Sequence, residues 1–81
     1  MSRQHSQEGL MAAFDSLSKM IDKLIEPKLL MGLRESELYK SYLEAKKISI
    51  KAAKEAAITF EMIQALRGYR ENFRTWKPEG Q

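Results

Sequence analysis

The 81-residue sequence has no cysteine, only two prolines and four glycines, and a single histidine. Without cysteine the chain can form no disulfide, no thiolate zinc site and no cysteine nucleophile. So few turn-forming residues argue against a fold of many short strands. The length allows one domain at most, and an isolated core of this size would be marginally stable. The sequence therefore favours one small helical domain.

Long apolar runs are missing as well. Charged residues interrupt every apolar stretch well before the ~20 residues that a membrane-spanning helix needs. The N-terminal part reaches only a short apolar patch, at residues 10–14, and no small-residue cleavage site follows it. We therefore expect no membrane span. The lack of cysteine agrees with a reducing compartment, so the expected location is cytoplasmic.

Enzyme chemistry has little support. The one histidine, His5, lies in the polar N-terminal stretch, and the sequence contains no phosphate-binding loop, dinucleotide-binding, zinc-protease or serine-hydrolase motif. The carboxylates are spread along predicted helices close to lysine or arginine, at Glu37, Glu44, Glu55, Glu61 and Glu71. That spacing is typical of a solvated helix face rather than of an acid–base pair. We expect no enzyme activity, no cofactor and no metal.

The first predicted element is an amphipathic helix over residues 7–26, after a flexible tail at 1–6. Its apolar residues recur at steps of four and three, as one face of a helix requires, and they are Leu10, Phe14, Leu17, Ile21 and Leu24. Ser6 is a suitable N-cap, and Pro27 ends the helix because the residue before a proline avoids the α region.

Residues 27–35 form the predicted connection, which is unusually apolar for a loop. It contains Leu29, Leu30, Met31 and Leu33, with Gly32 available to close a short helical turn. The favoured interpretation is that these side chains plug the core between two helices. The alternative is an exposed apolar knob that docks to another molecule.

Residues 36–75 predict one long helix, capped by Ser36 and followed by a tail at 77–81. Neither glycine nor proline occurs from Glu37 to Arg67, and strong helix formers dominate that stretch. Gly68 marks the possible break, at a cost of about 1 kcal/mol if it stays helical. Residues 7–76 thus predict a single all-α domain, a helical hairpin of one shorter and one long helix with a possible short third helix.

The long helix would be apolar on two sides. One face holds the residues Leu38, Tyr42, Ala45, Ser49, Ala52, Ala53, Ala56, Phe60 and Ile63. A second stripe, on a different side, holds Ile58, Met62, Leu66, Tyr69, Phe73 and Trp76. The shorter helix cannot cover both. Either the chain bends near Gly68 into a three-helix bundle, or a second copy covers the surplus face; we favour the second, a dimer or higher oligomer.

The charge distribution adds a basic character to the second half of the chain. The whole net charge of +3 lies in residues 34–81, because residues 1–33 carry four charges of each sign. One basic group is a stripe on the predicted long helix, formed by Lys40, Lys47, Lys51 and Lys54. The other interleaves with the aromatic stripe and includes Arg67, Arg70 and Arg74. Both are compatible with an acidic partner.

The leading functional hypothesis is protein–protein interaction, as an adaptor, chaperone or regulator. Its predicted partner-binding residues are Met62, Leu66, Tyr69, Phe73, Trp76, Arg67, Arg70 and Arg74, since interface cores favour these residue types. The alternative is a basic helical dimer that binds nucleic acid through Lys40, Lys47, Lys51 and Lys54. No motif relates the chain to a particular family of small helical proteins.

Overall fold

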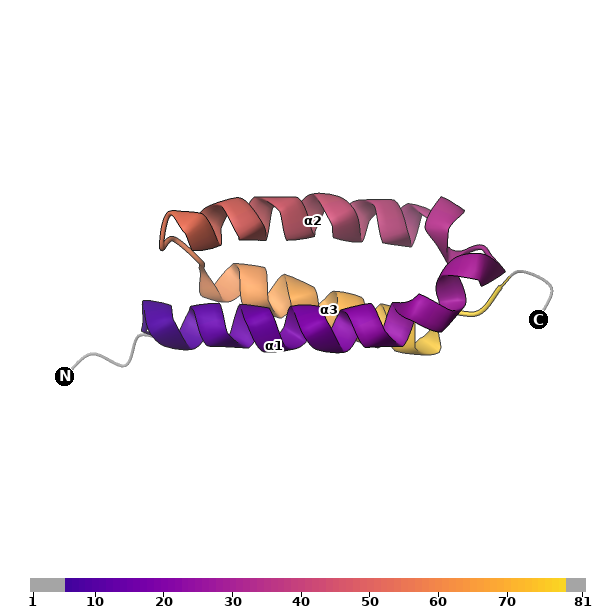
Figure 1. The fold of residues 1–81 in the computed structure, drawn as a ribbon, viewed down its shortest axis with the longest axis horizontal. Helices are drawn as coiled ribbons and strands as arrows, with labels where there is room; N and C mark the ends of the chain where they lie inside the picture. The colour runs from indigo at the N-terminus through magenta and orange to yellow at the C-terminus, as the bar shows by residue number, and fades with distance from the viewer. Residues whose placement is uncertain (1–5, 79–81) are drawn as a thin grey trace.

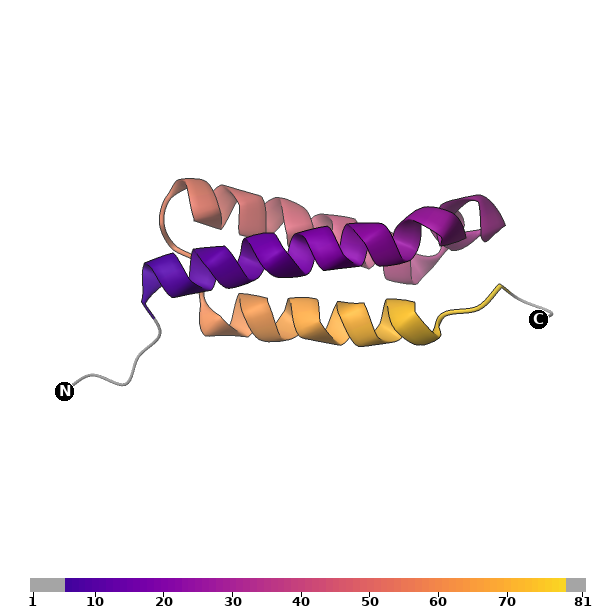
Figure 2. The ribbon, with the colours of Figure 1, turned by 60° about the horizontal axis from the view of Figure 1, so that its bottom comes forward.

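The computed structural model describes residues 6–78 and shows three α-helices. They are α1 (Gln7–Ile25), α2 (Glu37–Lys54) and α3 (Phe60–Thr75), with two short 3₁₀ helices, η1 (Glu26–Met31) and η2 (Leu33–Glu35), between α1 and α2. In Figure 1, α2 runs back antiparallel to α1, and α3 returns beside both in the direction of α1. Figure 2, turned by 60°, shows the same three-helix bundle. The all-α prediction is confirmed.

Each of the three α-helices begins at a hydroxyl side chain that caps its first turn. The side chains of Ser6, Ser36 and Thr59 accept hydrogen bonds from the backbone N–H three residues further on, at 3.0, 3.1 and 3.2 Å. Each helix also has a glutamate in its first turn, where the helix dipole favours a negative charge. The predicted caps at Ser6 and Ser36 are confirmed; the cap at Thr59 was not predicted.

The predicted continuous helix over 36–75 is wrong, because the chain turns between Lys54 and Phe60. Ala56 has a φ of 53°, in the left-handed region. The N–H of Ala57 donates to the carbonyl of Ala52 at 2.7 Å, and the N–H of Ala56 donates to that of Ala53 at 3.1 Å. This pair of bonds is the Schellman motif that ends a helix. Gly68, the predicted break, lies inside α3.

Tertiary contacts at Ile58 explain why a run of good helix formers is interrupted there. The Ile58 side chain is only 3% exposed and belongs to the core. Its backbone N–H donates to Oε1 of Gln7 at 2.8 Å, and its carbonyl accepts from Nε2 of the same side chain at 3.1 Å. The turn is therefore fixed to the first turn of α1, and burial of Ile58 outweighs the helix propensity of its neighbours.

Ala56→Gly is expected to raise the free energy of unfolding by about 0.5–1 kcal/mol. A left-handed residue with a Cβ costs about 1–2 kcal/mol, which glycine avoids, while glycine loses part of that gain through its more flexible unfolded state. Urea unfolding followed by circular dichroism measures the change. The matched control is Ala57→Gly, one residue later and also exposed; with no positive φ to relieve, it should destabilise. Equal effects at both positions would contradict the left-handed turn.

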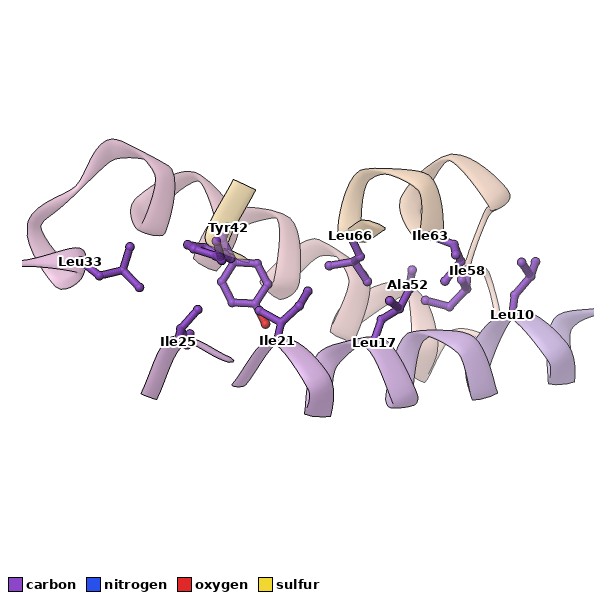
Figure 3. Close-up of a cluster of buried hydrophobic side chains, with 11 residues drawn as sticks. Leu10, Leu17, Ile21, Ile25, Leu33, Tyr42, Ala52, Ile58, Ile63 and Leu66 are labelled. Carbon is purple, nitrogen blue, oxygen red and sulfur yellow. The ribbon is translucent and has the colours of Figure 1, made fainter. Parts of the chain in front are cut away.

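The core runs the length of the bundle and draws on the three α-helices, on η2 and on the turn before α3. Figure 3 shows side chains from α1, α2, α3 and the connections pointing toward one another. The buried apolar residues are Leu10, Leu17, Ile21, Ile25, Leu33, Tyr42, Ala52, Ile58, Ile63, Leu66 and Phe73. Phe14 and Leu24 are partly buried against them, so the predicted apolar stripe of the first helix does face the core.

Three aromatic rings join α2 to α3 inside this core. Tyr42 meets Phe73 and Tyr69 edge-on, with ring centroids 5.2 and 5.7 Å apart, while Tyr69 and Phe73 stack at 6.2 Å. Burial, together with the negative charge of Asp22, raises the pKa of Tyr42 well above its ordinary value of 10. Tyr42 thus stays a neutral phenol and donates to Oδ1 of Asp22 at 3.3 Å, which links α2 to α1.

Each of the two interpretations of the connection, a core plug and an exposed knob, is correct for part of it. Leu33 is fully buried, and Leu29 packs against the core, as the plug interpretation predicts. Leu30 is 92% exposed and Met31 is 51% exposed, as the knob interpretation predicts. Gly32, with a φ of 105°, makes the left-handed turn that separates the exposed pair from Leu33.

Candidate interaction surfaces

The aromatic stripe that was predicted to bind a partner faces mostly inward. Leu66 and Phe73 are 1% and 0% exposed, so no partner can reach them in this fold. Met62, Tyr69 and Trp76 are partly buried and pack against the core. The prediction is therefore wrong for Leu66 and Phe73, because the turn at 55–59 folds the stripe against the other two helices.

The same turn removes the reason for which a second copy of the chain was predicted. The dimer was expected because one short helix could not cover two apolar faces of a long one. With the long helix divided, α1 and α2 both pack against α3, and α1 makes the most extensive contact with it. The less favoured alternative, a three-helix bundle, is the arrangement observed, although its break lies before Phe60 rather than at Gly68. The oligomeric state itself stays a prediction.

The three predicted arginines are exposed on α3. Arg74 donates to Oε1 of Glu71 at 2.8 Å, and this bond and charge hold the pKa of the Glu71 carboxyl below its usual value. Arg67 donates to Oε1 of Gln64 at 2.7 Å. Arg70 and Arg74 border a shallow groove between α1 and α3, whose other lining residues are Met20, Lys23 and Leu24. Arg70 and Arg74 therefore border a groove that α3 forms with α1, rather than an exposed aromatic stripe.

The predicted lysine stripe does lie on the solvent side of α2. Lys40, Lys47, Lys51 and Lys54 are all exposed. Lys40 lies 3.6 Å from the Glu37 carboxylate, and none of the ion pairs between described residues includes the other three lysines. Those three positive charges are therefore available to an outside anion.

Lys46 has a different, structural environment. Its ammonium lies 3.2 Å from both carboxylate oxygens of Asp22 on α1, and 5.8 Å from the centre of the Tyr42 ring. The side chain is 25% exposed. It ties α2 to α1 by an ion pair and a cation–π contact.

Three exposed aliphatic side chains accompany the lysine stripe, and they were not predicted from the sequence. Leu43, Ile48 and Ile50 are 45%, 57% and 40% exposed. Ile48 and Ile50 line a shallow hollow of about 370 Å³ with Glu44, Lys47, Lys51 and Lys54. We call this surface the α2 outer face and define it by the residues Lys40, Leu43, Lys47, Ile48, Ile50, Lys51 and Lys54. Leu43 and Ile50 each lie three residues after one lysine of the stripe and four before the next, so the sequence places these two on the lysine side of the helix, although their exposure depends on the fold.

A second hollow, of about 460 Å³, lies where the connection meets the segment after α3. Its lining residues are Pro27, Lys28, Met31, Trp76, Lys77 and Pro78, and we call it the Trp76 hollow. In Figures 1 and 2 this is the end at which α1 passes into the connection and α3 ends. Trp76 is half-buried there, so one member of the predicted stripe does line an accessible surface.

Residues that could support catalysis remain dispersed. Glu37, Glu44, Glu55, Glu61 and Glu71 are all exposed, and Glu71 pairs with an arginine. Across residues 6–78, no three or more histidine, cysteine, aspartate or glutamate side chains gather where they could hold a metal ion. His5 lies outside the described residues. Within the described chain, no helix combines the length and the apolar character needed to cross a membrane.

Comparison with known proteins supplies no relative from which a function could be transferred. No protein-family model matches the chain, no curated protein is similar to it at a significant level, and no solved structure matches its fold significantly.

Proposed function

We propose that this protein is a non-enzymatic binding module, an adaptor, chaperone or regulator, that recognises an acidic and apolar protein surface through the α2 outer face. The observation that supports it best is the combination on one helix of three exposed aliphatic side chains with lysines that have no acidic partner among the described residues. Cytoplasmic location, which the lack of cysteine favours, is part of the proposal.

Exposed aliphatic residues on a folded surface favour burial against a partner. Grouped apolar side chains at a soluble surface often mark interaction sites, whereas scattered ones are ordinary. Leu43 and Ile50 lie seven residues apart and so project from the same side of α2. Lysine stems can extend the apolar contact while their ammonium groups stay in water. The face is therefore suited to a partner that presents carboxylates to the lysines and aliphatic residues to the side chains on either side of them.

Charge complementarity favours a different protein over a second copy of this chain. A two-fold dimer through the α2 outer face would place the lysines of one copy close to those of the other. Like charges brought together at an interface are unfavourable, whereas an acidic partner would be attracted and steered by them. Glu44 is the one acidic residue that lines the hollow on this face. A homo-oligomer through another surface stays compatible with the proposal.

Nucleic acid is the second candidate, supported by the same unpaired lysines. A row of lysines along an exposed helix can neutralise phosphates. Leu43, Ile48 and Ile50 favour a protein partner instead, because aliphatic side chains gain nothing from contact with phosphates, whereas burial against an apolar protein surface is favourable. Binding of a protein partner should therefore depend on those aliphatic residues, whereas binding of nucleic acid should not.

The test is a cross-linked pull-down with three matched variants of the full chain. Ile48→Ser with Ile50→Ser removes the apolar part of the face, and Lys47→Glu with Lys51→Glu reverses its charge. Lys19→Glu with Lys23→Glu makes the same charge change on α1 and is the control. We expect one captured protein to bind the control like the wild type, and both α2 variants at least about tenfold more weakly. Equal binding by all variants would contradict the proposal.

Titration of the purified protein with duplex and single-stranded DNA tests the second candidate, nucleic acid, separately from the first. Binding that falls steeply between about 50 and 200 mM salt, and that the lysine variant loses but the isoleucine variant keeps, would assign nucleic acid as the ligand. Light scattering on a sizing column gives the oligomeric state of the same samples. A dimer that the lysine variant strengthens would show that the α2 outer face binds a second copy.

A further inference from the structure

We infer that the Trp76 hollow is a second binding site, which takes a short peptide segment carrying apolar side chains flanked by carboxylates. The site is separate from the α2 outer face, with which it shares no residue, and the inference does not depend on the proposed function. It follows from the walls of the hollow, from the cations at its rim and from the exposed side chains beside it.

The walls of the hollow have the composition of an interface core. Pro27, Met31, Trp76 and Pro78 provide its apolar surface. Tryptophan and methionine are enriched where protein interfaces are fully buried. A volume of about 460 Å³ falls within the usual size of binding pockets for small ligands and short segments. Two prolines restrict the backbone of the walls, so little conformational freedom is lost when a ligand binds.

Exposed apolar side chains extend the same surface. Leu30, at 92% exposed, precedes Met31, which lines the hollow and is itself 51% exposed. The left-handed turn at Gly32 holds both residues away from the core that Leu33 enters. A peptide seated in the hollow would cover Met31 and Trp76 and reach Leu30. Burial of that apolar area is the main favourable contribution to binding.

The charged residues that line the hollow are Lys28 and Lys77, both positive. The Lys28 ammonium is fixed in place, because it donates to the carbonyl oxygens of Phe73 and Arg74 at the C-terminus of α3. A lysine has three N–H donors, so one remains for an incoming carboxylate. Lys77 is exposed and belongs to a different segment of the chain. Cations on two segments around an apolar centre match an extended peptide with carboxylates on either side of its apolar residues.

Trp76 is the only tryptophan in the sequence, so its fluorescence reports directly on this hollow. The probe is the blocked peptide acetyl-DELLED-amide, titrated into the full chain. Its two controls are acetyl-KKLLKK-amide, which inverts the charge, and acetyl-DESSED-amide, which removes the apolar side chains. We expect a saturable blue shift with the first peptide and none with either control, because both the charge and the apolar contact are required.

Substitutions of exposed residues show whether the fluorescence change arises from binding at the Trp76 hollow. Lys77→Gln with Met31→Ser should weaken binding of the acidic peptide about tenfold, and circular dichroism checks that this variant is folded. Leu43→Ser, on the α2 outer face, should leave the affinity unchanged, so failure of this inference and failure of the proposed function are distinguishable.

Three results would overturn the inference. The first is no saturable change with the acidic peptide, and the second is an equal response to the basic one. The third is saturation by single-stranded oligo-dT but not by the peptide, which would make the hollow a base-stacking site.

Discussion

Phe73→Ala is expected to lower the free energy of unfolding by about 3–5 kcal/mol. The side chain is fully buried, and its ring contacts both Tyr42 and Tyr69, so truncation leaves a cavity and removes two aromatic pairs. A domain of this size has only about 4–12 kcal/mol of stability to lose. The variant should therefore be largely unfolded in mild denaturant, and urea titration monitored by circular dichroism measures the loss.

Two controls separate the core role of Phe73 from a surface role. Phe73→Leu keeps most of the apolar volume and should lose clearly less stability than the alanine variant. Met20→Ala truncates a side chain that is 43% exposed on α1 and should change stability by no more than about 0.5 kcal/mol. If Phe73→Ala kept its stability but changed the molecular mass in light scattering, the aromatic stripe would be an external seam, as the sequence had suggested.

Local sequence signals were sufficient to predict the first helix and the starts of two helices. The regular apolar spacing in residues 7–26 is a strong signal over a short range. The α-helix does end before Pro27, but Glu26 keeps α-region backbone angles and the chain continues as η1, so the expected effect of the proline on the preceding residue is wrong. Ser6 and Ser36 cap as expected because a capping hydroxyl acts only on the next turn. These features depend on neighbours in the sequence, so no knowledge of the packing was needed.

The turn between α2 and α3 could not be predicted in the same way. Alanine is the best helix former, so Glu55, Ala56 and Ala57 carry no local signal for a stop. The interruption depends on Ile58 entering the core and on Gln7 bonding both backbone groups of that residue, contacts that span most of the chain. Gly68 had a stronger local signal but is accommodated within α3 on an exposed side.

The two apolar faces of the second half of the chain were predictable from the sequence, but what covers the second face was not. A helix apolar on two sides must be covered on both, and the spacing of the apolar residues was enough to reveal that requirement. Whether a second copy or the chain itself provides the cover depends on where the helix stops. Because that stop had no local signal, Leu66 and Phe73 were assigned to a partner although they are core residues.

The candidate surfaces also have some features that were predictable from the sequence and others that depend on the tertiary fold. The exposure of the lysine stripe was predictable, because four lysines on one side of a helix favour solvent whatever packs on the other side. Exposure of Leu43, Ile48 and Ile50 depends on which sides of α2 meet α1 and α3, and so on the tertiary fold. The Trp76 hollow brings Pro27 and Pro78 together from distant parts of the chain, and residue spacing alone gives no signal for that.

Leu33→Ala is expected to lower the free energy of unfolding by about 2–5 kcal/mol, although the residue lies in a connection rather than in a long helix. The leucine side chain is fully buried and anchors the segment that joins α1 to α2. Its loss would leave a cavity beneath η2 and loosen the hold of the connection on both helices. Urea unfolding, with hydrogen exchange of residues 26–36, measures the global and the local effects.

Leu30→Ala is the matched control, because it makes the same chemical change three residues earlier. With 92% of the Leu30 residue surface exposed, the substitution should change stability by no more than about 0.5 kcal/mol. The same variant should weaken binding of the acidic peptide to the Trp76 hollow, so the two leucines separate a stabilising plug from a binding surface. If Leu33→Ala were as harmless as Leu30→Ala, the connection would not be anchored in the core, and the rigidity ascribed to the hollow would lose its basis.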